Sequence, residues 1–339
     1  MAIDVVDQVL DIIEERPIFV YHEIVHNKHV VSRLRGRGAV FVDDLSEIPE
    51  PRAGKIVVFS AHGVSPALRE EAKRLGLTAI DATCPLVTKV HSEAVRYARQ
   101  GFQILLVGHR NHQEVIGTSG EAPDATQVVE SPGDIERLTI RDPAKLVYLT
   151  QTTLSTDDAG VIIEALKVSF PLIKSPPSED ICYATTNRQH AVRTIAPECD
   201  LVIVVGSKNS SNSVRLTEIS ENAGTPAVLV DDVTEIPHPL PRRARCTEGG
   251  EPTVLLTAGA SAPEDLVASI CRAFVERYGA RLEQWDVVDE DVEFNLPGTL
   301  KKMMHAKGID PDSRRIRVVK TPITAETYGT TALTVSARG

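Results

Sequence analysis

One pattern recurs along the whole chain: a short apolar run, then small polar residues, then an amphipathic stretch of helical periodicity. The apolar runs begin at Ile56, Ile104, Val147, Leu201 and Val254. Strands that are apolar on both faces and alternate with helices are typical of parallel sheets covered by helices on both sides. The pattern therefore predicts an α/β fold, with ligands bound beyond the carboxyl ends of the strands, where the polar turns lie.

The number of these units exceeds what one small sheet holds, which predicts two or three α/β domains in a chain of 339 residues. Two prolines in Lys174-Ser-Pro-Pro-Ser178 interrupt the pattern. We expect domains over residues 1–81, 82–178 and 179–300. After Leu300 the periodicity fades and the charge turns basic, which predicts a loosely ordered tail over residues 301–339.

Charge and cysteine content exclude several classes of protein. The formal net charge of −10 argues against a nucleic acid as the main partner. No apolar run approaches the roughly 18 residues of a membrane span, and no basic, apolar signal peptide is present at Met1. The five cysteines contain no CxxC pair, which excludes a zinc ribbon, and their odd number indicates reduced thiols and a cytoplasmic location.

Serines in the polar turns fit two different roles. Ser65, Ser155 and Ser261 each stand where a helix N-cap is expected, and capping alone explains each of them. Helix N-termini also bind phosphate groups through their free N–H groups. The run Ser210-Ser211-Asn212 offers more polar groups than one cap needs, which favours phosphate binding there.

Three of the ten histidines, His26, His62 and His112, lie where an extended segment ends at a polar turn. Protonated, they would give an acidic protein the local positive charge that holds a diphosphate. Glu114, two residues beyond His112, is either a solvated carboxylate or a proton donor. Taken singly, Cys84 and Cys182 are more often small buried apolar residues than metal ligands.

Seven segments, taken in order, resemble successive motifs of the LytB family of diphosphate reductases. A single match would be weak, but an ordered set spanning about residues 2–300 is specific. The segments are Glu23-Ile-Val-His26-Asn27, Ser60-Ala-His62-Gly63-Val64-Ser65, Asp81-Ala-Thr-Cys84-Pro85, Thr150-Gln-Thr-Thr-Leu-Ser155, Asp180-Ile-Cys182-Tyr-Ala-Thr-Thr-Asn-Arg-Gln189, Val205-Gly-Ser-Lys-Asn-Ser-Ser-Asn212 and Thr257-Ala-Gly-Ala-Ser261-Ala-Pro263.

The resemblance implies three small α/β domains in a trefoil around a [4Fe–4S] iron–sulfur cluster, with Cys84 and Cys182 as metal ligands. The implied reaction is the reductive dehydroxylation of 4-hydroxy-3-methylbut-2-enyl diphosphate to isopentenyl and dimethylallyl diphosphate, with ferredoxin or flavodoxin as electron donor. The implied catalytic residues are Glu114, His112 and Thr152. The implied substrate-binding residues are His26, His62, His112, Thr152, Ser210, Ser211, Asn212 and Ser261.

The chain departs from the family at its start. The family begins with an apolar strand and a loop that carries the first cluster cysteine, whereas Met1 resembles a position in the helix after that loop. We expect a coding start farther upstream. Cys199, Cys246 and Cys271 match no ligand motif. The alternative is a non-catalytic paralogue that binds a diphosphate without a complete cluster. A phosphate-transfer enzyme ranks last, because the chain has no P-loop.

Overall fold

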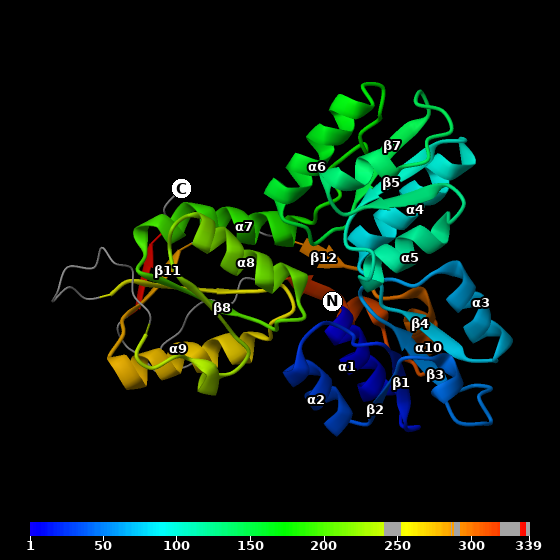
Figure 1. The fold of residues 1–339 in the computed structure, drawn as a ribbon. Coiled ribbons are helices and arrows are strands. Elements are labelled where there is room, and N and C mark those ends of the chain that lie inside the picture. The colour runs from blue at the N-terminus through cyan, green and yellow to red at the C-terminus, as the bar shows by residue number, and fades with distance from the viewer. Residues whose placement is uncertain (241–251, 286, 288–291, 319–332, 337–339) are drawn as a thin grey trace. The chain divides into compact units, whose positions relative to one another are not determined.

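The computed structural model describes residues 1–240, 252–285, 287, 292–318 and 333–336. These residues form two compact units. The first holds Met1–Val25, His29–Cys182 and Glu293–Arg317, and the second holds His26–Lys28 with the described residues of Tyr183–Val292 and from Val318 on. Within the described part, no helix is long and apolar enough to cross a membrane. Each unit is built from parallel sheets covered by helices, which confirms the α/β class (Figure 1).

The first sheet of the first unit has the strand order β2-β1-β3-β4 and all its pairs are parallel. Helix α3 covers one face, where Phe19, Phe59 and Ala72 pack together. Helices α1, α2 and α10 pack against the other face. The elements are α1 (Ala2–Ile12), β1 (Ile18–Tyr21), α2 (Lys28–Gly36), β2 (Ala39–Val42), β3 (Ile56–Phe59), α3 (Pro66–Arg74), β4 (Thr78–Asp81) and α10 (Gly298–Ala306).

The second sheet of the first unit has the parallel order β6-β5-β7. Helices α4 and α5 cover one face, and α6 covers the other (Figure 1). Five successive residues of β5 are fully buried, as expected of a central parallel strand. The elements are α4 (Pro85–Arg99), β5 (Gln103–Val107), α5 (Gln113–Glu121), β6 (Thr126–Val129), β7 (Leu146–Thr150) and α6 (Thr156–Ser169).

The main sheet of the second unit has the parallel order β10-β8-β9. Helices α7 and α8 pack on one face through Val192, Leu216 and Ile219, and α9 packs on the other through Ile270 and Phe274 (Figure 1). The elements are α7 (Tyr183–Ile195), β8 (Leu201–Val205), α8 (Ser211–Asn222), β9 (Ala227–Val230), β10 (Val254–Ala258) and α9 (Glu264–Tyr278).

Shorter elements complete the described chain. Two small two-stranded sheets pair β11 with β14 and β12 with β13. Short 3-10 helices follow several strands. The bounds are β11 (Leu282–Trp285), β12 (Val292–Phe294), β13 (Ile316–Val318), β14 (Leu333–Ser336), η1 (Leu45–Glu47), η2 (Pro132–Arg137), η3 (Ala196–Glu198), η4 (Val233–Glu235) and η5 (Pro311–Arg314).

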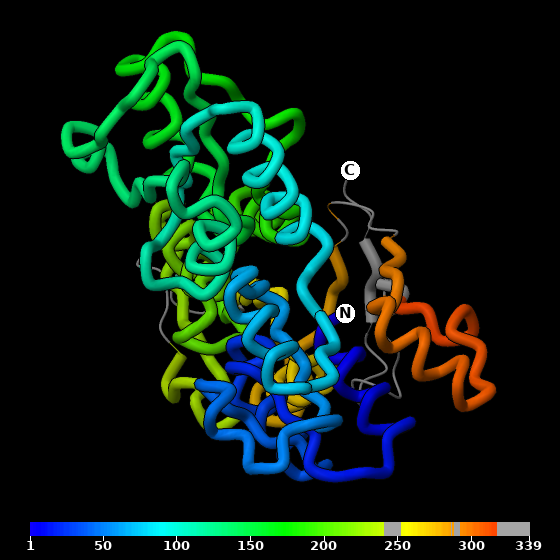
Figure 2. The backbone as a smooth tube through the Cα atoms, turned by 90° about the vertical axis from the view of Figure 1, so that its right-hand side faces the viewer, coloured from blue at the N-terminus to red at the C-terminus, as the bar shows by residue number. Residues whose placement is uncertain are grey.

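The segment after Leu300 differs from the loosely ordered tail that the sequence predicts. Residues 301–306 continue helix α10, and Met304 and Ile316 are buried in the same apolar cluster as α1. Figure 2 shows this orange segment beside the blue N-terminal helix. Residues 319–332 and 337–339 of the expected tail lie outside the described residues.

Candidate functional site

Six of the predicted site residues belong to the first unit, at or near the carboxyl ends of its strands. His62 follows β3, Cys84 follows β4, Glu114 lies beyond β5 and Thr152 lies beyond β7. The first two residues follow strands of the first sheet, and the other two lie beyond strands of the second sheet. His112 and Cys182 complete this group. The ring contact between His62 and His112 connects the two sets, and the backbone hydrogen bond from Cys182 to Thr152 adds the second cysteine. We call these six residues the Glu114 region.

Glu114 is a carboxyl buried in the first turn of α5, with a residue exposure of 2%. The Thr152 backbone N–H donates to Glu114 Oε1 at 2.6 Å, and the Thr152 hydroxyl donates to Oε2 at 3.0 Å. Burial raises the pKa of Glu114 to about 7, although these two hydrogen bonds act in the opposite direction and the charge of Asp180 adds to the rise. A carboxyl with such a pKa exchanges its proton near neutral pH.

His112 is the N-cap of α5, and its Nδ1 accepts a hydrogen bond of 3.2 Å from the Glu114 backbone N–H. With Nδ1 as the acceptor, the neutral form of the ring has its proton on Nε2. The His62 ring stands edge-on to the His112 ring, with centroids 5.6 Å apart at 89°. His62 Nδ1 lies 3.3 Å from the Ser60 hydroxyl.

Cys84 and Cys182 are both half-buried free thiols. Burial raises the pKa of Cys84, and hydrogen bonds from the backbone N–H groups of Leu86 and Val87, at the start of α4, oppose that rise. The backbone N–H of Cys182 donates to Thr152 at 2.9 Å, so this cysteine is tied to the residue that holds Glu114. Thiolates with N–H donors are the ligand chemistry of iron–sulfur clusters.

The other described cysteines have different surroundings. Both are buried: Cys271 lies in an apolar cluster, and the Cys199 thiol donates to the Ile195 carbonyl at 3.4 Å. Burial raises the pKa of Cys271 to about 11, which keeps it a neutral thiol. Cys246 lies outside the described residues. Within the described ranges, no three His, Cys, Asp or Glu side chains are grouped to hold a single metal ion.

The remaining five predicted residues belong to the second unit. Four of them surround the N-terminus of α8, and we call Ser210, Ser211, Asn212 and Ser261 the α8 region. The Ser210 hydroxyl caps the helix by accepting from the Ser213 backbone N–H at 3.4 Å. The Ser261 hydroxyl, from the turn after β10, donates to Ser210 Oγ at 3.5 Å. His26 lies in the same unit.

Asn212 is the unusual residue of the α8 region. It is 4% exposed, and neither its amide nitrogen nor its amide oxygen has a hydrogen-bond partner. Two glycines let the helix approach the strands this closely: a Cβ on Gly206 or Gly259 would lie 2.2 or 2.0 Å from Ser213 Oγ. A buried amide without partners at a helix N-terminus is suited to bind an anion, because the anion can accept a hydrogen bond from the amide nitrogen.

The sequence did not single out Asp180 and Lys89 as site residues. Asp180 is buried, accepts from the Thr150 backbone N–H at 3.0 Å and pairs with Lys89 Nζ at 2.9 Å. Its charge contributes to the raised pKa of Glu114. The only available sign was its place two residues before Cys182 in a recognised motif.

The sequence is similar to a known family and to several of its members. Residues 1–275 match the family model described as LytB protein. The 4-hydroxy-3-methylbut-2-enyl diphosphate reductase of Streptomyces avermitilis is 51% identical over 292 residues, which cover 86% of this chain and 83% of the relative. The enzyme of the same name from Rhodopirellula baltica is 49% identical over 301 residues, covering 89% and 91%.

Two solved structures have a similar fold. The E-1-hydroxy-2-methyl-but-2-enyl-4-diphosphate reductase from Plasmodium falciparum superposes with a TM-score of 0.83 at 38% identity, over 91% of this chain and 94% of that one. A structure titled (E)-4-hydroxy-3-methyl-but-2-enyl diphosphate reductase gives a TM-score of 0.58 at 28% identity, over 81% and 93%.

Proposed function

Because this chain belongs to the LytB protein family, we propose that it catalyses the reductive dehydroxylation of 4-hydroxy-3-methylbut-2-enyl diphosphate. The substrate takes up two electrons and two protons, its allylic C–O bond breaks, and water leaves together with isopentenyl or dimethylallyl diphosphate. The observation that carries this proposal is Glu114: a buried carboxyl with a pKa of about 7, held by Thr152, in the same unit as two half-buried thiols.

The electrons require a redox group, and we propose a [4Fe–4S] cluster held in part by Cys84 and Cys182. Both thiols are half-buried, and the N–H groups at Cys84 oppose the rise in its pKa that burial causes. When bound, such a cluster supplies electrons and a Lewis-acidic iron for the leaving oxygen. The described cysteines beyond these two are buried and are not ligands in this proposal. A ferredoxin- or flavodoxin-type protein is the proposed donor, in the cytoplasm.

The proton chemistry belongs to this chain's own residues. Glu114, protonated near neutral pH, donates toward the leaving hydroxyl, and the Thr152 hydroxyl lies at 3.0 Å to relay the proton. His112 keeps a proton on Nε2 because its Nδ1 accepts from the Glu114 backbone. We assign His112 to the hydroxymethyl end of the substrate.

We assign binding of the diphosphate end of the substrate to uncharged hydrogen-bond donors. In this proposal Asn212 and the serines of the α8 region donate to the phosphate oxygens, at a helix N-terminus that favours negative charge. We assign His26 and His62 to diphosphate binding as well. Because different residues bind the diphosphate and transfer the proton, mutations should be able to change diphosphate affinity and the rate of proton transfer separately.

Iron content and turnover test the proposal. The chain is purified without oxygen and assayed for iron, acid-labile sulfide and consumption of the substrate with a reduced electron donor. We expect visible thiolate–iron absorbance that Cys84→Ala and Cys182→Ala abolish. Cys271→Ala, at a buried thiol, is the matched control and should leave the absorbance in place. A protein that binds inorganic diphosphate but contains no iron and accepts no electrons from the donor would instead be the non-catalytic paralogue.

A further inference from the structure

The loop of residues 60–65 between β3 and α3, here called the His62 loop, carries one of the two histidines of the Glu114 region. The backbone N–H of Cys84 donates to Ala61 at 3.0 Å, and that of Gly63 donates to Ser60 at 3.3 Å. Gly63 has a φ of +81°, a conformation that favours glycine. Backbone contacts therefore fix the start of the loop, while residues 63–65 depend on neighbouring helices.

Helix α5 meets this loop through two glycines one turn apart. A Cβ on Gly117 would lie 3.2 Å from the Gly63 carbonyl oxygen, and a Cβ on Gly120 would lie 2.5 Å from Ser65 Cβ. The same helix begins at His112 and carries Glu114 in its first turn. The fit of the loop on α5 therefore sets the position of His62 relative to His112.

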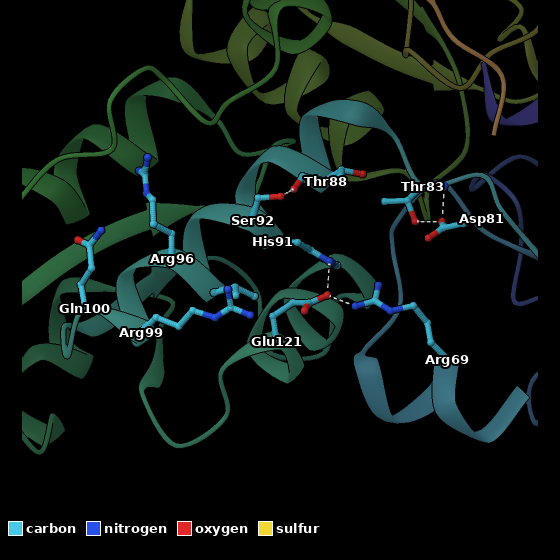
Figure 3. A pocket seen from close by; sticks show the side chains of 11 residues that line it. Arg69, Asp81, Thr83, Thr88, His91, Ser92, Arg96, Arg99, Gln100 and Glu121 are labelled. Carbon is cyan, nitrogen blue, oxygen red and sulfur yellow. Dashed lines mark hydrogen bonds and ion pairs between the residues drawn. The ribbon is translucent and has the colours of Figure 1, made fainter. Parts of the chain in front are cut away.

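A cluster of Arg69, His91 and Glu121 joins the loop to the helices behind it. Arg69 donates from Nη1 to the Val64 carbonyl at 3.1 Å and forms an ion pair with Glu121 through Nη2. Glu121 Oε1 lies 3.0 Å from His91 Nδ1. In Figure 3, His91 from α4 and Arg69 from α3 both point toward Glu121 at the end of α5.

The far edge of the His91 ring rests on the His62 loop. A Cβ on Gly63 would lie 2.8 Å from His91 Cε1 and 3.0 Å from Nε2. His91 is 5% exposed, and its Nε2 has no hydrogen-bond partner. Burial lowers the pKa of His91, so the neutral ring donates from Nδ1 to Glu121.

Stability alone is a poor explanation for this cluster. Buried ion pairs contribute little compared with apolar side chains of the same volume, and a buried nitrogen without a partner is costly. The cluster does fix the positions of its members, because Glu121 pairs with both Arg69 and His91. Arg69 in turn holds the Val64 carbonyl of the loop. It also lies along one side of a groove of about 620 Å³ between α3, α4 and α5, which Arg96 and Arg99 also line (Figure 3).

We propose that Arg69, His91 and Glu121 are positioning residues that hold the His62 loop on the Gly117–Gly120 face of α5, and so set the His62 ring against the His112 ring for diphosphate binding. The binding part of this inference rests on the proposed function. The inference that these residues set the position of the His62 ring relative to the His112 ring rests only on the contacts described above.

Two variants loosen the loop without touching either ring. Gly117→Ala places a methyl group against the Gly63 carbonyl, which must move by a few tenths of an ångström. Glu121→Gln keeps the shape of the side chain but removes the charge that pairs with Arg69. Gly160→Ala, in helix α6, is the matched control, because a Cβ there meets nothing within 4 Å.

Two measurements on the full chain separate positioning from plain stability. Ring signals of His62 and His112 are followed by NMR, with assignment from single His→Gln variants, and inorganic diphosphate affinity is measured by calorimetry. We expect Gly117→Ala and Glu121→Gln to shift both ring signals and to weaken binding roughly tenfold, the scale of one misplaced charge-assisted hydrogen bond. Gly160→Ala should change neither.

Unchanged ring signals in both variants, with only a lower unfolding midpoint, would overturn the inference and leave the cluster a structural element. If Gly117→Ala fails to fold, Glu121→Gln decides by the same measurements. Shifted rings in a protein whose wild type binds no diphosphate would support the positioning and refute the proposed function. The two failures are therefore distinguishable.

Discussion

The Glu114 region and the α8 region satisfy their buried polar groups in opposite ways. In the Glu114 region, both carboxyl oxygens of Glu114 accept hydrogen bonds from Thr152, and Asp180 accepts from Thr150. In the α8 region, Asn212 is equally buried, yet both of its amide atoms lack partners. In the first region the protein itself supplies the hydrogen-bond partners, and we propose that a bound diphosphate supplies one in the second. We therefore expect diphosphate binding to depend on the α8 region together with His26 and His62, and proton transfer to depend on Glu114 and Thr152.

The largest expected effect comes from Glu114→Gln. The amide keeps the shape of the side chain but cannot donate the carboxyl proton, so turnover should fall by about 10²- to 10⁴-fold. Inorganic diphosphate affinity should stay the same, because Glu114 is not one of the proposed diphosphate-binding groups. Steady-state assays measure the turnover, and calorimetry on the same preparation measures the diphosphate affinity. A rate within a few-fold of wild type would remove Glu114 from the proton transfer and break the comparison.

Stability against pH provides a second measure of the Glu114 region. The folded chain keeps the Glu114 proton up to about pH 7, whereas an ordinary glutamate releases it near 4.5. Between these values the folded state binds more protons than the unfolded state. The contribution of this group is therefore complete below about pH 4.5 and is lost as the pH rises through 7, on the order of 3 kcal/mol.

Urea unfolding of wild type and Glu114→Gln at pH 4 to 8 tests this sign. The difference between the two unfolding free energies should change steadily over that range, with wild type losing stability relative to the variant. Parallel curves would mean that Glu114 has an ordinary pKa. The α8 region contributes no comparable titration, because Asn212 and the serines carry no ionisable group in this range.

The strand ends were predictable from sequence, but the partners found there were not. Apolar runs such as that at Ile104 locate a buried strand, and the polar residues after it must lie at the sheet edge. Glu114 and Thr152, however, are 38 residues apart, and only the parallel pairing of β5 and β7 brings them together. The raised pKa depends on that burial and on Asp180, so no local pattern reveals it.

The segment after residue 300 shows a different limit. Lys301 and Lys302 make it look like a solvated tail, but Leu300 and Met304 stand four residues apart on one helical face and are fully buried. A single buried turn among charged residues gives too short a pattern to be recognised. In contrast, the serine-rich turn at 210–212 was identified because it holds more polar groups than a helix cap needs.

Asn212→Leu should separate affinity from stability. The leucine removes two buried polar atoms that have no partner, so the free energy of unfolding should stay level or rise. Diphosphate affinity should fall roughly 10- to 100-fold, the value of a hydrogen bond to a charged group. Calorimetry measures the diphosphate affinity, and urea unfolding measures the free energy of unfolding. A loss of stability would show that the amide already has a partner in the free protein.

Thr152→Val is the counterpart in the Glu114 region. It removes the hydroxyl that donates to Glu114 Oε2 and leaves a buried carboxyl oxygen without that bond. We expect a loss of about 1–3 kcal/mol of unfolding free energy, with diphosphate affinity unchanged. If this variant weakens diphosphate binding as much as Asn212→Leu does, the two regions do not divide the work as proposed.

The smallest effect concerns Ser210, whose hydroxyl caps α8 and is also a proposed phosphate ligand. Loss of the cap costs about 1 kcal/mol for Ser210→Ala but only a few tenths for Ser210→Gly. Because both variants lack the hydroxyl, both should lose the same two- to tenfold of diphosphate affinity, by rough analogy with one neutral hydrogen bond. Ser155→Ala, which removes the N-cap of α6, is the control and should lower stability alone. If Ser210→Gly binds diphosphate like wild type, the hydroxyl serves the helix and not the ligand.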